Sequence, residues 1–263
     1  MICGPVILVM GPFCFMNIYI LGGGCFGTQY ARWLLTARER EKASFERLII
    51  VDRDPKCAAN KLSLRSGMSL RAQRSNPMFE NSDWVDFLVD HIENAKAGTD
   101  DLIVPSHAAP HLLGKAFISL SLRPRASAAS RGGSNLQMIG IPTPIGTPFE
   151  KELEKGVVAV SMATWNCPAN CTEPGKCPHI HAPRAWDLEI MLRDWAKKAG
   201  LDEFFVFPAR HFAYAVSAIS AQTIVEAWRS LRKRLAKPGE YLVGVATSSA
   251  CHGIISTFKV AIE

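Results

Sequence analysis

The stretch that decides the fold reads NIYILGGGCFGTQYARWLL from Asn17 to Leu35, followed by RLIIVDRD from Arg47 to Asp54. An apolar run typical of a β-strand leads into the spacing Gly-x-Gly-x-x-Gly, and a helical apolar pattern follows directly. Gly22 permits a tight turn, Gly24 lets a phosphate approach the backbone, and Gly27 lets the helix pack close to the strand. The helix start adds N–H groups and a positive dipole end. The stretch therefore predicts a phosphate-binding strand–turn–helix unit.

An acidic residue completes this pattern. Asp52 closes the second apolar run, 25 positions after Gly27, where a carboxylate can accept hydrogen bonds from ribose hydroxyls. Strand, turn, helix, strand and acid thus occur in the order that a dinucleotide site requires. The expected cofactor is NAD or NADP, and the expected binding residues are Gly22, Gly24, Cys25, Phe26, Gly27, Asp52 and Arg53.

Residues 17–54 resemble the nucleotide-binding half of NAD(P)-binding Rossmann proteins, such as dehydrogenases and the regulatory domains of potassium-uptake proteins. The resemblance covers the first quarter of the chain, and the rest is similar only in its α/β alternation. It implies that Asp52 favours NAD, because a carboxylate there repels a 2′-phosphate, whereas Arg53 keeps NADP open.

Two other classes use similar parts. Class I methyltransferases place a glycine-rich loop after their first strand and end in an antiparallel strand pair, but an acid usually precedes that loop, and here Leu21 does. Ubiquitin-activating-type adenylating proteins share a glycine turn and a V-D-x-D run like Val51–Asp54. The absence of an Arg-Gln pair after that run weakens the second match.

Strand and helix patterns alternate along the chain, which predicts an α/β protein: a Rossmann-like, doubly wound and mostly parallel sheet with a C-terminal antiparallel edge strand. The expected strands are Asn17–Leu21, Arg47–Val51, Leu102–Pro105, Gly156–Met162, Glu203–Phe207, Glu240–Ala246 and Ile254–Ile262. The expected helices are Thr28–Glu41, Trp84–Ala97, Pro110–Phe117, Trp186–Ala199 and Ile219–Leu235.

The net charge of +6 comes from two short stretches. Segments 62–78 and 119–138 share Ser-Leu-Arg, contain no acidic residue, and resemble inserted repeat elements; without their six arginines the chain has 24 basic and 24 acidic residues. A third strand before Asp83 is then expected to be shortened or displaced. The predicted organisation is a non-native or disordered extension 1–15 before a start at Met16, a dinucleotide-binding half 16–118, and a second α/β half 139–263.

A Cys- and Pro-rich loop spans 166–183 and reads NCPANCTEPGKCPHIHAP. Thiolates brought this close repel one another unless a cation holds them, so the loop predicts a metal site. Zinc and an iron–sulfur cluster both fit three cysteines with a further ligand. The expected ligands are Cys167, Cys171, Cys177, His179 and, from the remote ATSSACHG segment, Cys251, with His181 and His252 as substitutes. Unliganded structural cysteines and a nucleophilic or redox thiol remain the alternatives.

No complete catalytic constellation is visible. His107, His211 and His252 each follow or precede a predicted strand and are the candidate proton donors. His111 flanks the same loop as His107. Arg184 is a candidate for binding an anionic substrate, with capping of the cysteine loop as the alternative, and Arg210 shares the position of His211.

The composition restricts the partners. Because the basic excess lies in two segments, the charge does not indicate a nucleic-acid partner. The apolar start is interrupted by glycine and proline and lacks a basic leader, which argues against a membrane segment and favours a cytoplasmic location. We expect an NAD(P)-dependent oxidoreductase with a Cys-ligated metal acting on a small molecule, and the sequence leaves self-association open. The alternatives are a non-catalytic nucleotide sensor and an S-adenosylmethionine-dependent methyltransferase.

Overall fold

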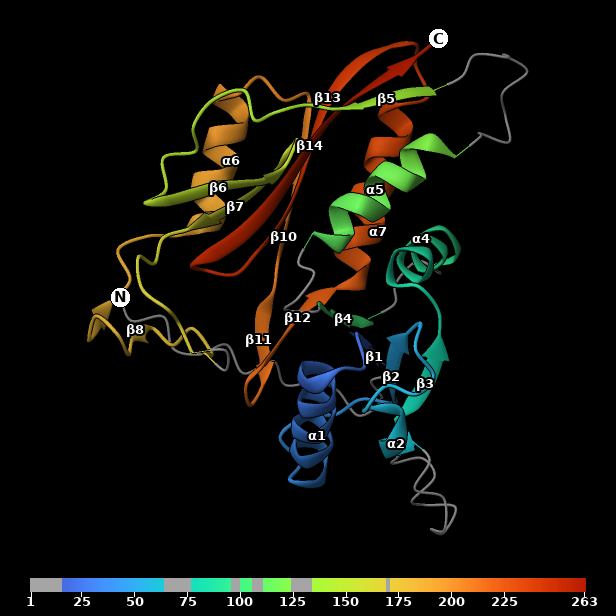
Figure 1. Ribbon diagram of the computed structural model, residues 1–263, viewed down its shortest axis with the longest axis vertical. Coiled ribbons are helices and arrows are strands. Elements are labelled where there is room, and N and C mark those ends of the chain that lie inside the picture. Colours follow the sequence, from blue (N-terminus) through green and yellow to red (C-terminus); the bar gives the residue numbers. More distant parts are fainter. Residues whose placement is uncertain (1–15, 64–76, 96–99, 106–110, 124–133, 169–170) are drawn as a thin grey trace.

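The computed structural model describes residues 16–63, 77–95, 100–105, 111–123, 134–168 and 171–263. Two six-stranded sheets and the helices around them make up this part of the chain (Figure 1). The predicted extension 1–15, His107 and most of both arginine-rich segments lie outside the described residues.

The first sheet has a parallel part of four strands in the order β3-β2-β1-β4. Strand β2 (Arg47–Asp52) is buried from Leu48 onward, because a strand pairs with it on each side and helices cover both faces of the sheet. Helix α1 (Cys25–Glu39) connects β1 to β2 and packs its buried residues against one face. The remaining strands are β1 (Asn17–Leu21), β3 (Met78–Asn81) and β4 (Leu102–Val104).

Two strands from much later in the chain complete this sheet. Strand β12 (Val216–Ser220) pairs antiparallel with β4, and β11 (Arg210–Ala213) pairs antiparallel with β12. Within the parallel part β3 is in place beside β2, with Met78 opposite Ile49. The expected displacement of this strand is therefore wrong, whereas a length of four residues agrees with the expected shortening.

The second sheet is almost entirely antiparallel, with the order β10-β13-β14-β7-β6 and β5 also paired with β14. Only β10 and β13 run parallel. Outermost in that order, β6 exposes charged side chains, which protect an open sheet edge from pairing with other chains. The strands are β5 (Ser134–Met138), β6 (Phe149–Glu154), β7 (Val157–Ser161), β10 (Glu203–Pro208), β13 (Gly239–Ser248) and β14 (His252–Ile262).

A layer of three helices joins the two sheets. Helices α4 (Trp84–Asn94), α5 (Leu112–Leu122) and α7 (Ala221–Arg234) share one apolar core with Val51 of the first sheet and Val243 of the second. Outside this layer, α1 covers the other face of the first sheet, and α6 (Leu188–Lys198) covers the other face of the second (Figure 1). The short helix α2 (Asn60–Ser63) follows β2, and the two-residue strands β8 (Lys176–Cys177) and β9 (Ala182–Pro183) pair within the cysteine loop.

The predicted fold class is wrong. Of the strand pairs among the described residues, four are parallel and seven antiparallel. They form two mixed six-stranded sheets and the small β8–β9 pair instead of one doubly wound sheet. The last strand, β14, pairs antiparallel with β13 as expected, but it is a central strand and not an edge, because β7 and β5 pair with its other side. Local periodicity predicts the longer helices and several strands but misses β5, β6, β11 and β12, and the pairing partners of the strands come from distant segments.

Candidate functional site

The glycine turn has the geometry of a phosphate-binding unit. Gly22 adopts φ +105°, which a side chain would strain, and a Cβ on Gly27 would lie 1.7 Å from the Gly22 carbonyl oxygen. Gly24 is the N-cap of α1, no side chain caps the helix there, and a Cβ on Gly24 would meet nothing within 4 Å. The first N–H groups of α1 therefore start beside open space, and Cys25 and Phe26 are exposed around it.

Asp52 serves this turn from within. Its side chain is 8% exposed, and its two carboxylate oxygens accept hydrogen bonds from the backbone N–H groups of Gly23 (2.6 Å) and Asp54 (2.8 Å). The thiol of Cys57 packs against Gly23, where a Cβ would lie 2.3 Å from the sulfur. Arg53 is exposed. The residue predicted to bind a ribose thus also fixes the shape of the turn, and each oxygen keeps a second lone pair.

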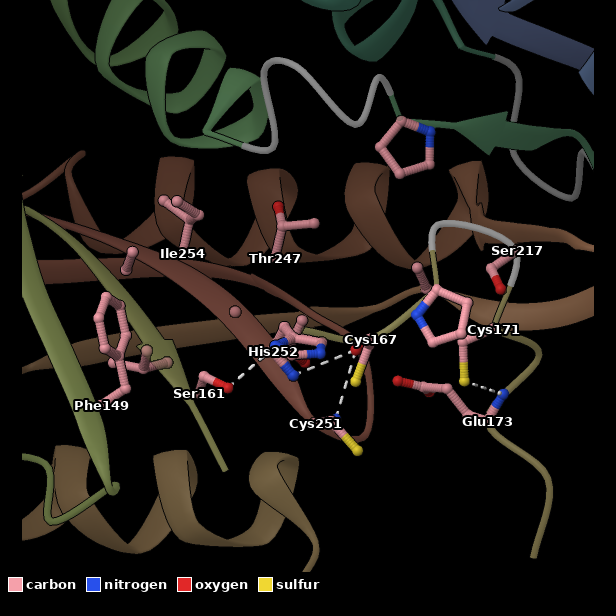
Figure 2. A pocket seen from close by; sticks show the side chains of 18 of the residues that line it. Phe149, Ser161, Cys167, Cys171, Glu173, Ser217, Thr247, Cys251, His252 and Ile254 are labelled. Carbon is pink, nitrogen blue, oxygen red and sulfur yellow. Dashed lines mark hydrogen bonds between the residues drawn. The ribbon is translucent and has the colours of Figure 1, made fainter. Parts of the chain in front are cut away.

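A pocket of about 450 Å³ is lined by residues of both sheets. From the first sheet and its helix come Tyr30 of α1, Pro105 directly after β4, and Ser217 of β12. From the second sheet come the end of β13, the start of β14, and part of β7. The cysteine loop contributes further lining residues, so the pocket brings together segments that are far apart in the sequence (Figure 2).

Three of the predicted metal ligands line this pocket, namely Cys167, Cys171 and Cys251. Burial raises the pKa of the Cys167 thiol, and the neighbouring Cys171 and Cys177 thiols raise it further. Burial likewise raises the pKa of Cys251, so both sulfurs favour the protonated thiol. Nevertheless, within the described ranges no group of three or more histidine, cysteine or acidic side chains is arranged to hold a metal ion.

Two half-buried indoles, each with a buried N–H, accompany these thiols. The N–H of Trp165 lowers the pKa of Cys167, and the N–H of Trp186 lowers the pKa of Cys251. In each case the effect is smaller than the increase caused by burial. Neither N–H makes a hydrogen bond of standard geometry to a described residue. His179, predicted as a ligand, is exposed and stacks on the Trp165 ring at 4.5 Å, so it braces this indole.

His252 is the predicted histidine that lines the pocket. Its Nδ1 lies 3.0 Å from the Ser161 hydroxyl, which donates its own proton to the Ala163 carbonyl (2.8 Å). Because that proton is in use, the geometry favours Nδ1–H as the donor toward Ser161.

The other predicted side chains lie elsewhere. His211 is exposed and hydrogen-bonds the Tyr214 carbonyl within the β11–β12 hairpin. Arg184 donates to the Pro174 carbonyl (2.7 Å) and so caps the cysteine loop. Arg210 forms an ion pair with Glu189. His111 is at the N-cap of α5, where burial and Lys115 lower its pKa.

Sequence reasoning missed several lining residues. Tyr30 lies within α1, and Ser161 and Ser248 are the last residues of β7 and β13; none was predicted, because their pocket neighbours are far away in sequence. Glu173 was missed as well, although a local signal existed. It is the acidic residue between Cys171 and Cys177 in a loop otherwise rich in proline and cysteine.

Together these features define a protein of two mixed β-sheets and surrounding helices, with a glycine turn after β1 and a thiol-lined pocket formed by residues of both sheets. The chain belongs to the family whose model is described as "Uncharacterized protein, C-terminal domain", which matches residues 116–261. This match includes the second sheet, the cysteine loop and His252, and it begins after the glycine turn. No curated protein and no solved structure matches the chain. No helix among the described residues is long and apolar enough to span a membrane.

Proposed function

We propose that this protein binds NAD or NADP at the glycine turn, with the nicotinamide end directed into the thiol-lined pocket, and that it is an oxidoreductase. One observation carries the proposal: the turn follows β1 and the pocket residue Pro105 follows β4, so both lie at the carboxyl ends of adjacent parallel strands. Strands β1 and β4 pair in parallel with Ile20 opposite Val104. Both strands therefore end at the same side of the sheet. Leu21, the last residue of β1, leads into the turn, and Pro105, directly after β4, lines the pocket. Neighbouring strands are about 4.8 Å apart.

Helix α1 gives a second measure of this proximity. Tyr30 lines the pocket six positions after Gly24, which corresponds to about 9 Å along a helix. A ligand whose phosphates lie at the N-terminus of α1 therefore needs to extend by little more than one ring system to enter the pocket. Ligands of open sheets commonly bind beyond the carboxyl ends of parallel strands, where the turn and Pro105 lie.

The pocket residues supply the other requirements of a hydride transfer. The cofactor would supply the hydride, and the apolar walls would exclude water from the reacting carbon. His252 is the pocket histidine that would exchange a proton with the substrate. The buried Tyr30 phenol, whose pKa burial raises to about 12, stays protonated at neutral pH and would not compete as a base.

Titration calorimetry with NAD⁺, NADH, NADP⁺, NADPH and S-adenosylmethionine tests the proposal. The decisive variant is Gly24→Ala, because the added methyl meets no protein atom within 4 Å and can only obstruct a ligand. Gly140→Ala is the matched control, since its Cβ also meets nothing within 4 Å. We expect wild type and G140A to bind one dinucleotide equally and G24A to bind it about tenfold or more weakly, or 1.4 kcal/mol, with unchanged melting temperatures.

Three results would refute the proposal. The first is that no dinucleotide binds with a Kd below about 1 mM, which corresponds to a binding free energy of −4.1 kcal/mol. The second is unaltered binding in G24A, which would place the phosphates elsewhere. The third is preferential binding of S-adenosylmethionine, which would make the protein a methyltransferase. Binding without turnover of any hydride donor or acceptor would instead favour the nucleotide sensor.

A thiolate-bound metal is a separate proposal, and the function above involves no step through it. Its support is the proximity of the thiols. Cys171 and Cys177 raise the pKa of Cys167, and Cys167 in turn raises the pKa of Cys251. Against it stands the arrangement of the described residues, which would have to draw together to ligate an ion. Metal analysis after anaerobic purification decides the matter: about one equivalent of zinc or iron, lost in Cys167→Ser and kept in the exposed-site variant Cys25→Ser, supports it. A metal-free protein removes it.

A further inference from the structure

The thiol-lined pocket has an unbalanced charge. Among the described residues that line it, Glu173 is the acidic one and none is lysine or arginine. Arg184 does not line the pocket: its guanidinium donates to the Pro174 carbonyl, and its charge lowers the pKa of Cys251, one of the lining thiols. A pocket whose lining carries a carboxylate and no cation favours a cationic ligand over an anionic one.

Glu173 is held in position by its surroundings. Its Oε2 accepts a hydrogen bond from the Ala250 N–H (2.8 Å), and its own N–H is 3.4 Å from the Cys171 sulfur, which accepts it. Its backbone adopts φ +52°, a conformation that non-glycine residues rarely keep unless their contacts enforce it. The carboxylate is close enough to Cys167 and Cys251 to raise the pKa of both thiols. The loop therefore presents this charge to the pocket at a fixed place.

The pocket is also amphipathic. Figure 2 shows Glu173 and the thiols on one side of the view, and Phe149 and Ile254 on the opposite side. The walls between them are largely apolar, with Ala159 and Val160 of β7 among them. A molecule that fits this arrangement has a charged or polar end and an apolar body.

Ser248 supplies an independent sign of a ligand. This side chain lines the pocket at the end of β13 and is 3% exposed, yet its Oγ has no hydrogen-bond partner among the described groups. A buried hydroxyl without a partner is uncommon in native structures, and a bound polar group would satisfy it.

We propose that the pocket binds a small organic cation with an apolar body, such as a primary amine, whose ammonium group faces Glu173 and whose body lies toward Phe149 and Ile254. As the substrate class of the oxidoreductase this inference rests on the proposed function. As a binding property it stands alone, because amine binding can be measured without any dinucleotide.

Three probes of equal length test it: 4-phenylbutylamine, 4-phenylbutanol and 4-phenylbutyrate, titrated by calorimetry at neutral pH with EDTA present and dinucleotide absent. We expect the amine to bind about tenfold or more tightly than the alcohol, which corresponds to 1.4 kcal/mol, and the carboxylate to bind most weakly. Glu173→Gln keeps an acceptor for the Ala250 N–H and should remove the preference for the amine over the alcohol. Glu41→Gln is the matched control, since Glu41 is exposed, also has positive φ (55°), and lies outside the pocket.

Ser248→Ala provides a second variant that deletes no hydrogen bond of the described protein and should weaken amine binding about threefold. The proposal is overturned if the carboxylate binds as well as the amine, if E173Q keeps the preference, or if none of the probes binds. It is also overturned if EDTA-resistant zinc is bound in wild type and lost in E173Q, because the carboxylate would then serve a metal. Amine binding together with absent dinucleotide binding would instead contradict only the proposed function.

Discussion

Asp52→Asn should destabilise the protein although it removes only a charge. The carboxylate accepts one backbone N–H on each oxygen, from Gly23 at 2.6 Å and Asp54 at 2.8 Å. An asparagine amide has one acceptor oxygen and directs N–H donors at the other backbone N–H, so one hydrogen bond is lost and one buried donor is left unsatisfied. Hydrogen bonds to charged groups contribute about 1.5–3 kcal/mol each. We therefore expect the free energy of unfolding to fall by roughly 2–3 kcal/mol.

Urea denaturation at neutral pH measures this loss, provided that the slope against urea is unchanged. Asp54→Asn is the control in the same loop: Asp54 is exposed, and its Oδ1 accepts one hydrogen bond, from the Lys56 N–H. It should cost less than about 0.5–1 kcal/mol. A D52N protein within about 0.5 kcal/mol of wild type would refute the reasoning and leave Asp52 available mainly to a ligand. For the same reason D52N alone cannot test ribose binding.

Two further changes have determined signs. Gly27→Ala places a methyl 1.7 Å from the Gly22 carbonyl oxygen, so we expect a lower melting temperature and a loss of about 1–3 kcal/mol, larger than the ~1 kcal/mol that alanine adds to a helix; an unchanged melting temperature would mean that α1 can move off β1. For His91, which contacts the Tyr19 and Phe87 rings, burial lowers the pKa from its ordinary 6.5. The folded state therefore disfavours its charged form, and its contribution to stability is present above pH 6.5 and lost as the pH falls toward the folded pKa. His91→Phe should lose less stability than wild type between about pH 7.5 and 5.5, as measured by urea midpoints; equal losses would show that His91 is not responsible.

Local pattern predicted many of the elements but not how they assemble. The apolar run and glycine spacing placed β1 and α1 close to where they are, because both depend on neighbouring residues. The β11–β12 hairpin escaped prediction, since Arg210–Ser220 has a weak strand pattern and its partner, β4, lies far upstream. Sheet pairing is decided by such distant partners, and this is why a doubly wound sheet was predicted in place of two mixed ones.

The site shows the same division. Cysteine content and spacing singled out Cys167 and Cys171, and the structure places them in one pocket with Cys251 and His252. His179 was chosen for its spacing alone, yet its ring lies on Trp165. Glu173 and Ser248 matter through charge and an unpartnered hydroxyl, and both properties exist only once the fold encloses them.

The late arrival of β12 in the first sheet has a consequence for synthesis of the chain. Ile103 of β4 pairs with Ile219, 116 positions further on. At roughly 5–20 residues per second on the ribosome, β4 waits on the order of ten seconds with one edge unpaired. Its edge is a template for another nascent chain during this interval. A fragment that ends before residue 210 would keep that edge open permanently, so the glycine-turn half is expected to aggregate when it is expressed alone.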